Sequence, residues 1–309
     1  ITMHKKTSFP VGKVDFLELG PLSFNEFLLA GGQDALYELI VGMQWDMIAT
    51  FKTKFIELLR QYYFVGGMPE VVSDFLKNKD FNRVRELQKD ILKSYQSDFS
   101  KHAPVNIVPR INMVWDSIPA QLSKENRKFI FGIVKKGSRA KDFELALEWL
   151  ISSGLVYKVY RVTKPGIPLK AYIDHSAFKV FLTDVGLLGG MYDLDISSVM
   201  TGNRIFREFQ GTLTEQFIFQ QLMTEPLFYW SAEKSDGEID FIVQIKNMAI
   251  PVEVKAEENL MAKSLQAFNK KYNPGISVRT SMSDYRKEEW MINIPLYAMN
   301  EMTVKNLFP

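Results

Sequence analysis

The sequence predicts an α/β protein of more than one domain: a helical region, a small mixed domain and a C-terminal α/β domain. The chain from residue 34 to about residue 115 has helical periodicity throughout. After it come two helices, a hairpin and a further helix, between about residues 119 and 191. Two apolar, partly β-branched runs, residues 237–243 and 250–255, predict a second hairpin near the C-terminal end. At 309 residues the chain is long enough for about two or three such domains.

Composition excludes several classes of function. There is no cysteine, which rules out disulfides, thiolate metal sites and cysteine catalysis. The three histidines, His4, His102 and His175, lie far apart, which argues against a histidine metal cluster or Ser-His-Asp catalysis. A net charge of only +2 means that any contact with a polyanion depends on local patches. No apolar run approaches the roughly 20 residues of a membrane span and no signal peptide is visible, so we expect a cytoplasmic protein without a membrane partner.

The N-terminal third is predicted to start with a strand and to continue with helices. Residues 14–19 read as a strand that follows Ile1-Thr2-Met3 without an initiator methionine in first place, so we expect the chain to be part of a longer protein. Ser23 and Glu26 form a capping-box pattern at the start of a short helix that ends near residue 31. A long amphipathic helix is predicted over residues 81–101.

The next segment has the layout of a winged helix. Its second helix carries apolar residues at helical spacing, and Gly154 closes it: Phe143, Ala146, Leu147, Leu150 and Ile151. Two strands follow, residues 155–162 and 169–173, with a turn at residues 164–166. Such modules often place the second helix in the DNA major groove.

Charge on this module favours a structural or protein-contacting role over base reading. The outward face of the second helix carries Glu144 and Glu148 beside Lys141 and Ser152, and two carboxylates would repel phosphates. The wing is more basic. Its candidate nucleic-acid contacts are Lys158, Arg161, Lys164 and Lys170.

The C-terminal hairpin carries the strongest chemical signal. A turn at Lys246-Asn247 places Asp240 opposite Glu253, and Glu238 opposite Lys255. Opposed β-carbons lie about 5 Å apart, close enough for two carboxylates to hold one divalent cation. The other face is predicted to be apolar: Ile239, Phe241, Val243, Ile250, Val252 and Val254. The alternative is a solvated face with a cross-strand ion pair between Glu238 and Lys255.

An aspartate followed by Glu-x-Lys on the next strand resembles the active-site pattern of PD-(D/E)XK nucleases, the restriction-endonuclease-like fold. The resemblance implies that Asp240 and Glu253 bind Mg²⁺ or Mn²⁺ and that Lys255 orients the nucleophile. Glu215, on the preceding helix, matches the additional acidic residue and would hold a second metal or a metal-bound water. It shares a helical stripe with Thr212, Phe219 and Leu222, so this carboxylate needs a partner. Ile239 stands where the pattern has proline.

Several stretches together resemble bacterial AAA-type ATPases whose C-terminal region ends in a PD-(D/E)XK nuclease-like domain. They are residues 8–13, 21–28, 66–72, 178–188 and 211–216, with the hairpin. The resemblance implies a tail of the ATPase core (1–33), a lid-like helical region (34–115), a winged-helix domain (116–200) and a nuclease-like domain (201–309).

No G-x-x-x-x-G-K-[ST] motif occurs, so ATP is expected only in an intact protein that also contains the ATPase core. The expected function is a Mg²⁺-dependent nuclease-like domain that acts on DNA. The alternatives are a non-catalytic DNA- or protein-binding platform coupled to the ATPase core and a purely structural fragment. The sequence leaves the oligomeric state open.

Overall fold

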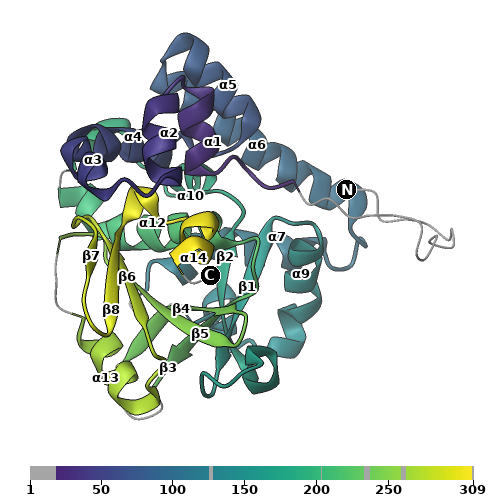
Figure 1. The fold of residues 1–309 in the computed structure, drawn as a ribbon. Coiled ribbons are helices and arrows are strands. Elements are labelled where there is room, and N and C mark those ends of the chain that lie inside the picture. The colour runs from purple at the N-terminus through teal and green to yellow at the C-terminus, as the bar shows by residue number, and fades with distance from the viewer. Residues whose placement is uncertain (1–18, 125–127, 203, 233–236, 259–261, 308–309) are drawn as a thin grey trace, which may run out of the picture.

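The computed structural model describes residues 19–124, 128–202, 204–232, 237–258 and 262–307 (Figure 1). It is a mixed α/β structure, as expected, with one eight-stranded sheet among the described residues. The strand expected over residues 14–19 lies almost wholly outside the described residues. None of the described helices is both long and apolar enough to cross a membrane.

The helical region confirms the sequence-based pattern. Ser23 Oγ accepts a hydrogen bond from the Glu26 backbone N–H, and the Glu26 carboxylate accepts one from the Ser23 backbone N–H, so the predicted capping box forms. Gly66 ends the fourth helix with φ 76°, a conformation that favours glycine. Asp80 accepts a hydrogen bond from the Asn82 backbone N–H (2.9 Å) and so caps the predicted long helix. The helices are α1 Phe24–Ala30, α2 Asp34–Val41, α3 Trp45–Thr50, α4 Lys52–Val65, α5 Pro69–Asn78 and α6 Phe81–His102.

The middle of the chain differs from the prediction at one strand. The strand expected over residues 169–173 is a 3-10 helix, and the second strand begins only at Ile173. Pro168 has no N–H to donate, and the Leu169 N–H donates to the Gln244 side chain (2.9 Å), so neither joins the ladder. The elements are α7 Val108–Leu122, α8 Phe131–Val134, α9 Ala140–Ser152, β1 Val156–Val162, η1 Leu169–Tyr172, β2 Ile173–Leu182, α10 Val185–Met191 and α11 Ile196–Thr201.

The C-terminal part has the expected order of helix, strand, hairpin, helix and further strands. Its first helix, α12, begins directly after the α11 segment and leads into the strands that carry the candidate site. The elements are α12 Arg204–Leu222, β3 Leu227–Ser231, β4 Glu238–Ile245, β5 Met248–Val254, α13 Lys263–Tyr272, β6 Ser277–Ser281, β7 Arg286–Lys287, β8 Met291–Pro295, η2 Leu296–Ala298 and α14 Glu301–Leu307.

The sheet joins the middle and the C-terminal part of the chain. Its strand order is β2-β1-β3-β4-β5-β6-β8-β7. Strand β1 pairs in parallel with β3 through Tyr160↔Phe228 and Arg161↔Tyr229. The hairpin interpreted as the wing therefore forms one end of the same sheet, and the buried apolar side chains run without a break from α1 to α14.

The register of the second hairpin is the predicted one. Phe241 pairs with Val252, and the ladder continues in step to Ile245 and Met248 at the turn. Lys246 adopts φ 52° in that turn. Asp240 and Glu253, which the sequence predicted to face each other, are the next positions beyond the last pair of this ladder.

A β-bulge corrects the predicted faces of β4. Phe228 pairs with Ile242 but Trp230 pairs with Ile239, so β4 carries one extra residue opposite β3. Ile239 consequently packs with Trp230 in the cluster beneath α13, whereas Phe241 packs in the main core. The expectation that Ile239 and Phe241 share one face was wrong, because strict alternation does not survive a bulge.

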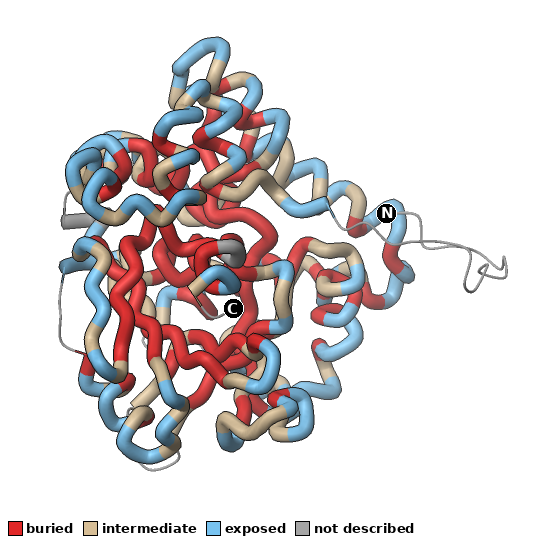
Figure 2. The backbone as a smooth tube through the Cα atoms, viewed as in Figure 1, coloured by how far each residue is buried: buried red, intermediate tan, exposed pale blue. Residues whose placement is uncertain are grey.

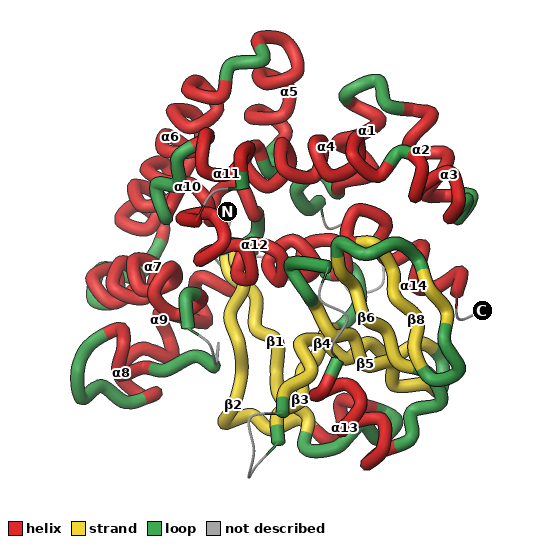
Figure 3. The backbone as a smooth tube through the Cα atoms, turned by 90° about the vertical axis from the view of Figure 1, so that its left-hand side faces the viewer, coloured by secondary structure: helices red, strands yellow, loops and turns green. Residues whose placement is uncertain are grey.

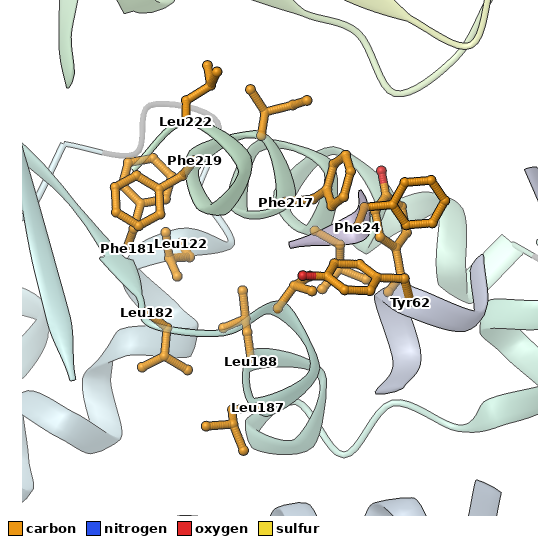
Figure 4. Close-up of a cluster of buried hydrophobic side chains, with 14 of the residues drawn as sticks. Phe24, Tyr62, Leu122, Phe181, Leu182, Leu187, Leu188, Phe217, Phe219 and Leu222 are labelled. Carbon is orange, nitrogen blue, oxygen red and sulfur yellow. The ribbon is translucent and has the colours of Figure 1, made fainter. Parts of the chain in front are cut away.

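Helix α12 lies between the helical region and the sheet, and α13 covers the opposite side of the sheet (Figure 3). Phe217 on α12 packs edge-on against Phe24 and Tyr62, and Phe219 stacks on Phe181 of β2 at 4.6 Å between ring centroids (Figure 4). Buried residues are concentrated in α10, the later part of α12 and the central strands, and the outer helices are exposed on their far sides (Figure 2).

Asp184 ties the helical region to this core. Its buried carboxylate accepts hydrogen bonds from the backbone N–H groups of Gly67 (2.6 Å) and Leu187 (2.9 Å). Gln220 of α12 donates to the same carboxylate (3.3 Å) and to the Tyr62 hydroxyl (2.8 Å). Three segments that are distant in sequence therefore share one buried polar contact.

We predict that Asp184→Ala destabilises the fold by about 3 kcal/mol, because two buried N–H groups lose their acceptor. The free energy of unfolding in urea measures the loss. The matched control is Asp193→Ala, which removes an exposed carboxylate paired with Lys89 and should change stability far less. Equal losses in the two variants would contradict the role given to Asp184.

Candidate functional site

Three of the four predicted site residues lie together at the ends of β4 and β5. The Asp240 carboxylate accepts a hydrogen bond from the Val254 backbone N–H (2.8 Å), which holds it beside Glu253. Glu253 Oε1 lies 3.1 Å from Lys255 Nζ. Two carboxylates and one ammonium therefore converge where the hairpin strands end.

Glu253 is the least satisfied group of this cluster. The residue is 2% exposed, and its Oε2 has no hydrogen-bond partner among the described residues. Burial raises the pKa of the Glu253 carboxyl, the nearby Lys255 ammonium opposes that change, and the charge of Asp240 adds to it. A carboxylate in this setting is stabilised by a further cation or by a proton.

Glu215 lies elsewhere, in a second charged cluster. Lys179 of β2 is fully buried, and its Nζ lies 3.0 Å from Glu215 Oε1 and in ion-pair contact with Glu238. The same ammonium lies 5.1 Å from the centroid of the Tyr229 ring. The partner that the sequence required for Glu215 is thus found in an ammonium group of this chain.

The structure does not gather all three predicted metal ligands. Within the residues that it describes, no three His, Cys, Asp or Glu side chains form a group that could hold a metal ion. The alternative cross-strand pair between Glu238 and Lys255 is not formed either, since Glu238 binds Lys179 and Lys255 binds Glu253. The bulge in β4 explains why Glu238 and Lys255 do not pair. It shifts the alternation of side chains before Ile239, so that Glu238 contacts Lys179 instead.

Two functional candidates were missed by the sequence analysis. Lys179 is a charged residue inside the apolar run 178–182, a signal that a buried partner exists. Arg279 of β6 is 1% exposed, pairs in register with Glu253, and donates through Nε to Asn293 Oδ1 (2.8 Å). Its position beside Glu253 depends on the parallel pairing of β5 and β6, which no local pattern reveals.

The four candidate nucleic-acid contacts are not equally available. Lys158 pairs with a glutamate of α9 and is largely buried, and Arg161 donates two hydrogen bonds to Asp174 (2.7 and 3.1 Å). Lys164 lies over the ring of a nearby tyrosine, and Lys170 is exposed on the 3-10 helix. Half of the predicted basic wing is therefore neutralised within the chain.

Two family models match the chain. Residues 56–198 match one described as a domain of unknown function (DUF8612). Residues 210–299 match one described as a domain of unknown function (DUF4143), which agrees with the resemblance to C-terminal regions of AAA-type ATPases. No curated protein and no solved structure matches the chain. The second match contains Glu215, Asp240, Glu253 and Lys255, and the first contains Lys179.

We predict that Lys179→Met destabilises the fold by about 3 kcal/mol, because two close carboxylates lose their shared buried cation. Adding Glu215→Gln to this variant should restore part of the loss, since it removes one of the two like charges. Thermal unfolding of the single and double variants measures both effects. Lys170→Met is the exposed control. A double variant less stable than Lys179→Met would contradict the charge argument.

We predict that Glu253→Gln is more stable than the parent chain near neutral pH without divalent cations. Burial raises the pKa of Glu253, so the folded state binds this proton more tightly than the unfolded chain does. The advantage of glutamine should shrink as the pH falls through the raised pKa toward the ordinary glutamate value of about 4.3. Thermal melts across this pH range test it, with exposed Glu257→Gln as the control. A constant difference at every pH would disprove the assignment.

Proposed function

We propose that this chain carries a divalent-cation-dependent site for phosphodiesters, formed by Asp240, Glu253 and Lys255. The observation that carries the proposal is the buried Glu253 carboxylate, whose Oε2 has no partner among the described residues and whose neighbour is a second carboxylate. Hard oxygen ligands of this kind suit Mg²⁺ or Mn²⁺. DNA is the proposed substrate.

The residues fit a cation in part. Asp240 and Glu253 would hold it, and Glu215 would not, because its carboxylate is bound to Lys179. A bound cation would supply neutralisation of the phosphate charge and a lower pKa for an attacking water. This replaces the three-carboxylate site expected from the sequence by a two-carboxylate site.

Lys255 has the properties of a group that meets a substrate. Its side chain is 34% exposed, whereas that of Glu253 is 3% exposed. The Lys255 ammonium pairs with Glu253 and is still partly exposed to solvent. It can therefore also bind a phosphate oxygen or orient a water molecule. A lysine in this position can therefore contact the buried acid and a bound phosphate at the same time.

The parent protein is proposed to be an AAA-type ATPase, with this chain as its C-terminal part. The match of residues 210–299 and the resemblance of several separate stretches support this. The ATPase core would bind ATP, and the helical region would connect that core to the sheet. The proposed nuclease-like site would then act in a protein driven by nucleotide hydrolysis.

A second function is favoured by a specific observation. Glu215 is committed to Lys179, and two of the basic residues of the expected wing are paired within the chain. In this second function the domain has the nuclease-like fold and the site residues but catalyses no reaction. It would serve as a DNA- or protein-binding platform for the ATPase core. Cation binding without cleavage of any DNA would support this function over the first.

We predict that Mg²⁺ or Mn²⁺ raises the Tm of the intact chain, because a cation bound only by the folded state stabilises it by mass action. Asp240→Asn should abolish the shift, and Glu215→Gln should retain it. Calorimetric or fluorescence melts with and without the cation measure this. A shift that depends on Glu215 but not on Asp240 would place the site elsewhere.

We also predict that the chain cleaves at least one of supercoiled, branched or single-stranded DNA in the presence of Mg²⁺ or Mn²⁺. Lys255→Met should lower cleavage by about 100-fold or more while leaving the cation-dependent Tm shift in place. Lys246→Met, in the exposed hairpin turn, is the matched control. Full cleavage by Lys255→Met would exclude the role given to this ammonium.

A further inference from the structure

We propose that Lys52, the first residue of α4, is a positioning residue that couples the helical region to the candidate site. The statement that the site binds a cation rests on the proposed function. The coupling between Lys52 and the residues of the site rests only on contacts within the chain. Two separate lines of contact lead from Lys52 back to the cluster of Asp240, Glu253 and Lys255.

The first line runs through the loop formed by residues 256–258, directly after Lys255. Lys52 Nζ lies 2.6 Å from Glu258 Oε1, three residues beyond Lys255. The same loop is held from α12, where Gln210 donates to the Ala256 carbonyl (2.8 Å). The Lys255 backbone N–H donates to a carbonyl of β6 (2.8 Å). These contacts fix the loop to three elements, and of those three α4 is the one in the helical region.

The second line runs across the sheet through Asn293. Lys52 Nζ lies 3.4 Å from Asp284 Oδ1, and the Asp284 carbonyl accepts a hydrogen bond from the Asn293 side-chain amide (2.9 Å). The Asn293 amide oxygen in turn accepts from Arg279 Nε (2.8 Å). Arg279 pairs in register with Glu253, and its charge opposes the rise in the pKa of that carboxyl that burial causes. The two lines meet at the ion pair between Lys255 and Glu253.

Lys52 is an unfavourable residue at the start of a helix, and its contacts with Glu258 and Asp284 offset this. A cation at the first residue of a helix opposes the helix dipole, and α4 has no acidic residue in its first turn to offset it. Partial burial lowers the pKa of Lys52, but the carboxylates of Glu258 and Asp284 outweigh this effect and raise the pKa above its usual value. The side chain of Lys52 is 24% exposed, so its ammonium is screened less than the two acids are.

Aromatic contacts also connect helices α3 and α4 to the C-terminal part of the chain. Trp45 of α3 stacks on Tyr285, with ring centroids 4.2 Å apart and an interplanar angle of 4°. Phe55 of α4 stacks on Tyr297 at 4.8 Å. A rearrangement of α3 and α4 would move these rings together with Lys52, so the segments that Lys52 contacts would shift with the helices.

Hydrogen–deuterium exchange without any cation tests the coupling directly. Lys52→Met should speed exchange in residues 255–258 and 282–285 by roughly threefold, and Lys52→Arg should restore protection because arginine also reaches two carboxylates. Lys54→Met is the matched control: Lys54 lies in the same turn but pairs with Glu57 of its own helix. Equal exchange in Lys52→Met and Lys54→Met overturns the inference.

A second arm separates this inference from the proposed function. By linkage, Mg²⁺ at the candidate site should slow exchange in residues 45–54 of the parent chain and of Lys54→Met, but not of Lys52→Met. If Mg²⁺ changes exchange in none of these proteins, the cation site fails, and the cation-free arm still decides the coupling. If Mg²⁺ slows exchange equally in Lys52→Met, the coupling through Lys52 is contradicted.

Discussion

Buried amide side chains of α12 connect the helical region, the middle segment and the sheet. The Gln216 amide accepts from the Leu182 N–H (3.0 Å) and donates to the Leu182 carbonyl (2.7 Å), so it completes the end of β2 as another strand would. Gln220 binds the start of α10 and a tyrosine hydroxyl of α4, and Gln221 accepts from the Phe24 N–H (2.8 Å) at the start of α1. Since a buried amide is costly without partners, the bonds of Gln216 and Gln220 hold α12 in place against the middle segment and the helical region.

The same helix explains why the charged residues fall into two clusters. Glu215 is on the side of α12 that meets β2, and Lys179 of that strand neutralises it. Asp240 and Glu253 lie at the ends of the hairpin strands. There the charges of Lys255 and Arg279 oppose the rise in the pKa of Glu253 that burial causes. Each cluster of acids therefore has its own cation from the chain, but Glu253 retains an oxygen without a partner among the described residues.

Local patterns in the sequence predicted much of the fold and part of the site. Helix α6, the capping box at Ser23 and the register of the β4–β5 hairpin follow from periodicity and turn chemistry, which act over a few residues. The bulge in β4 does not, because it depends on pairing with β3. The contact between Lys179 and Glu215 likewise depends on how β2 packs against α12, 36 positions along the chain. These tertiary contacts decided which carboxylates share a site.

In the proposed cation site, Asp240 and Glu253 bind the ion without Glu215. Anomalous diffraction from a crystal of the chain soaked in Mn²⁺ tests it most directly, because it locates the ion without reference to activity or stability. We expect one peak between the Asp240 and Glu253 carboxylates and none beside Lys179. A peak at Glu215 and Glu238, or no peak at either cluster, would contradict it.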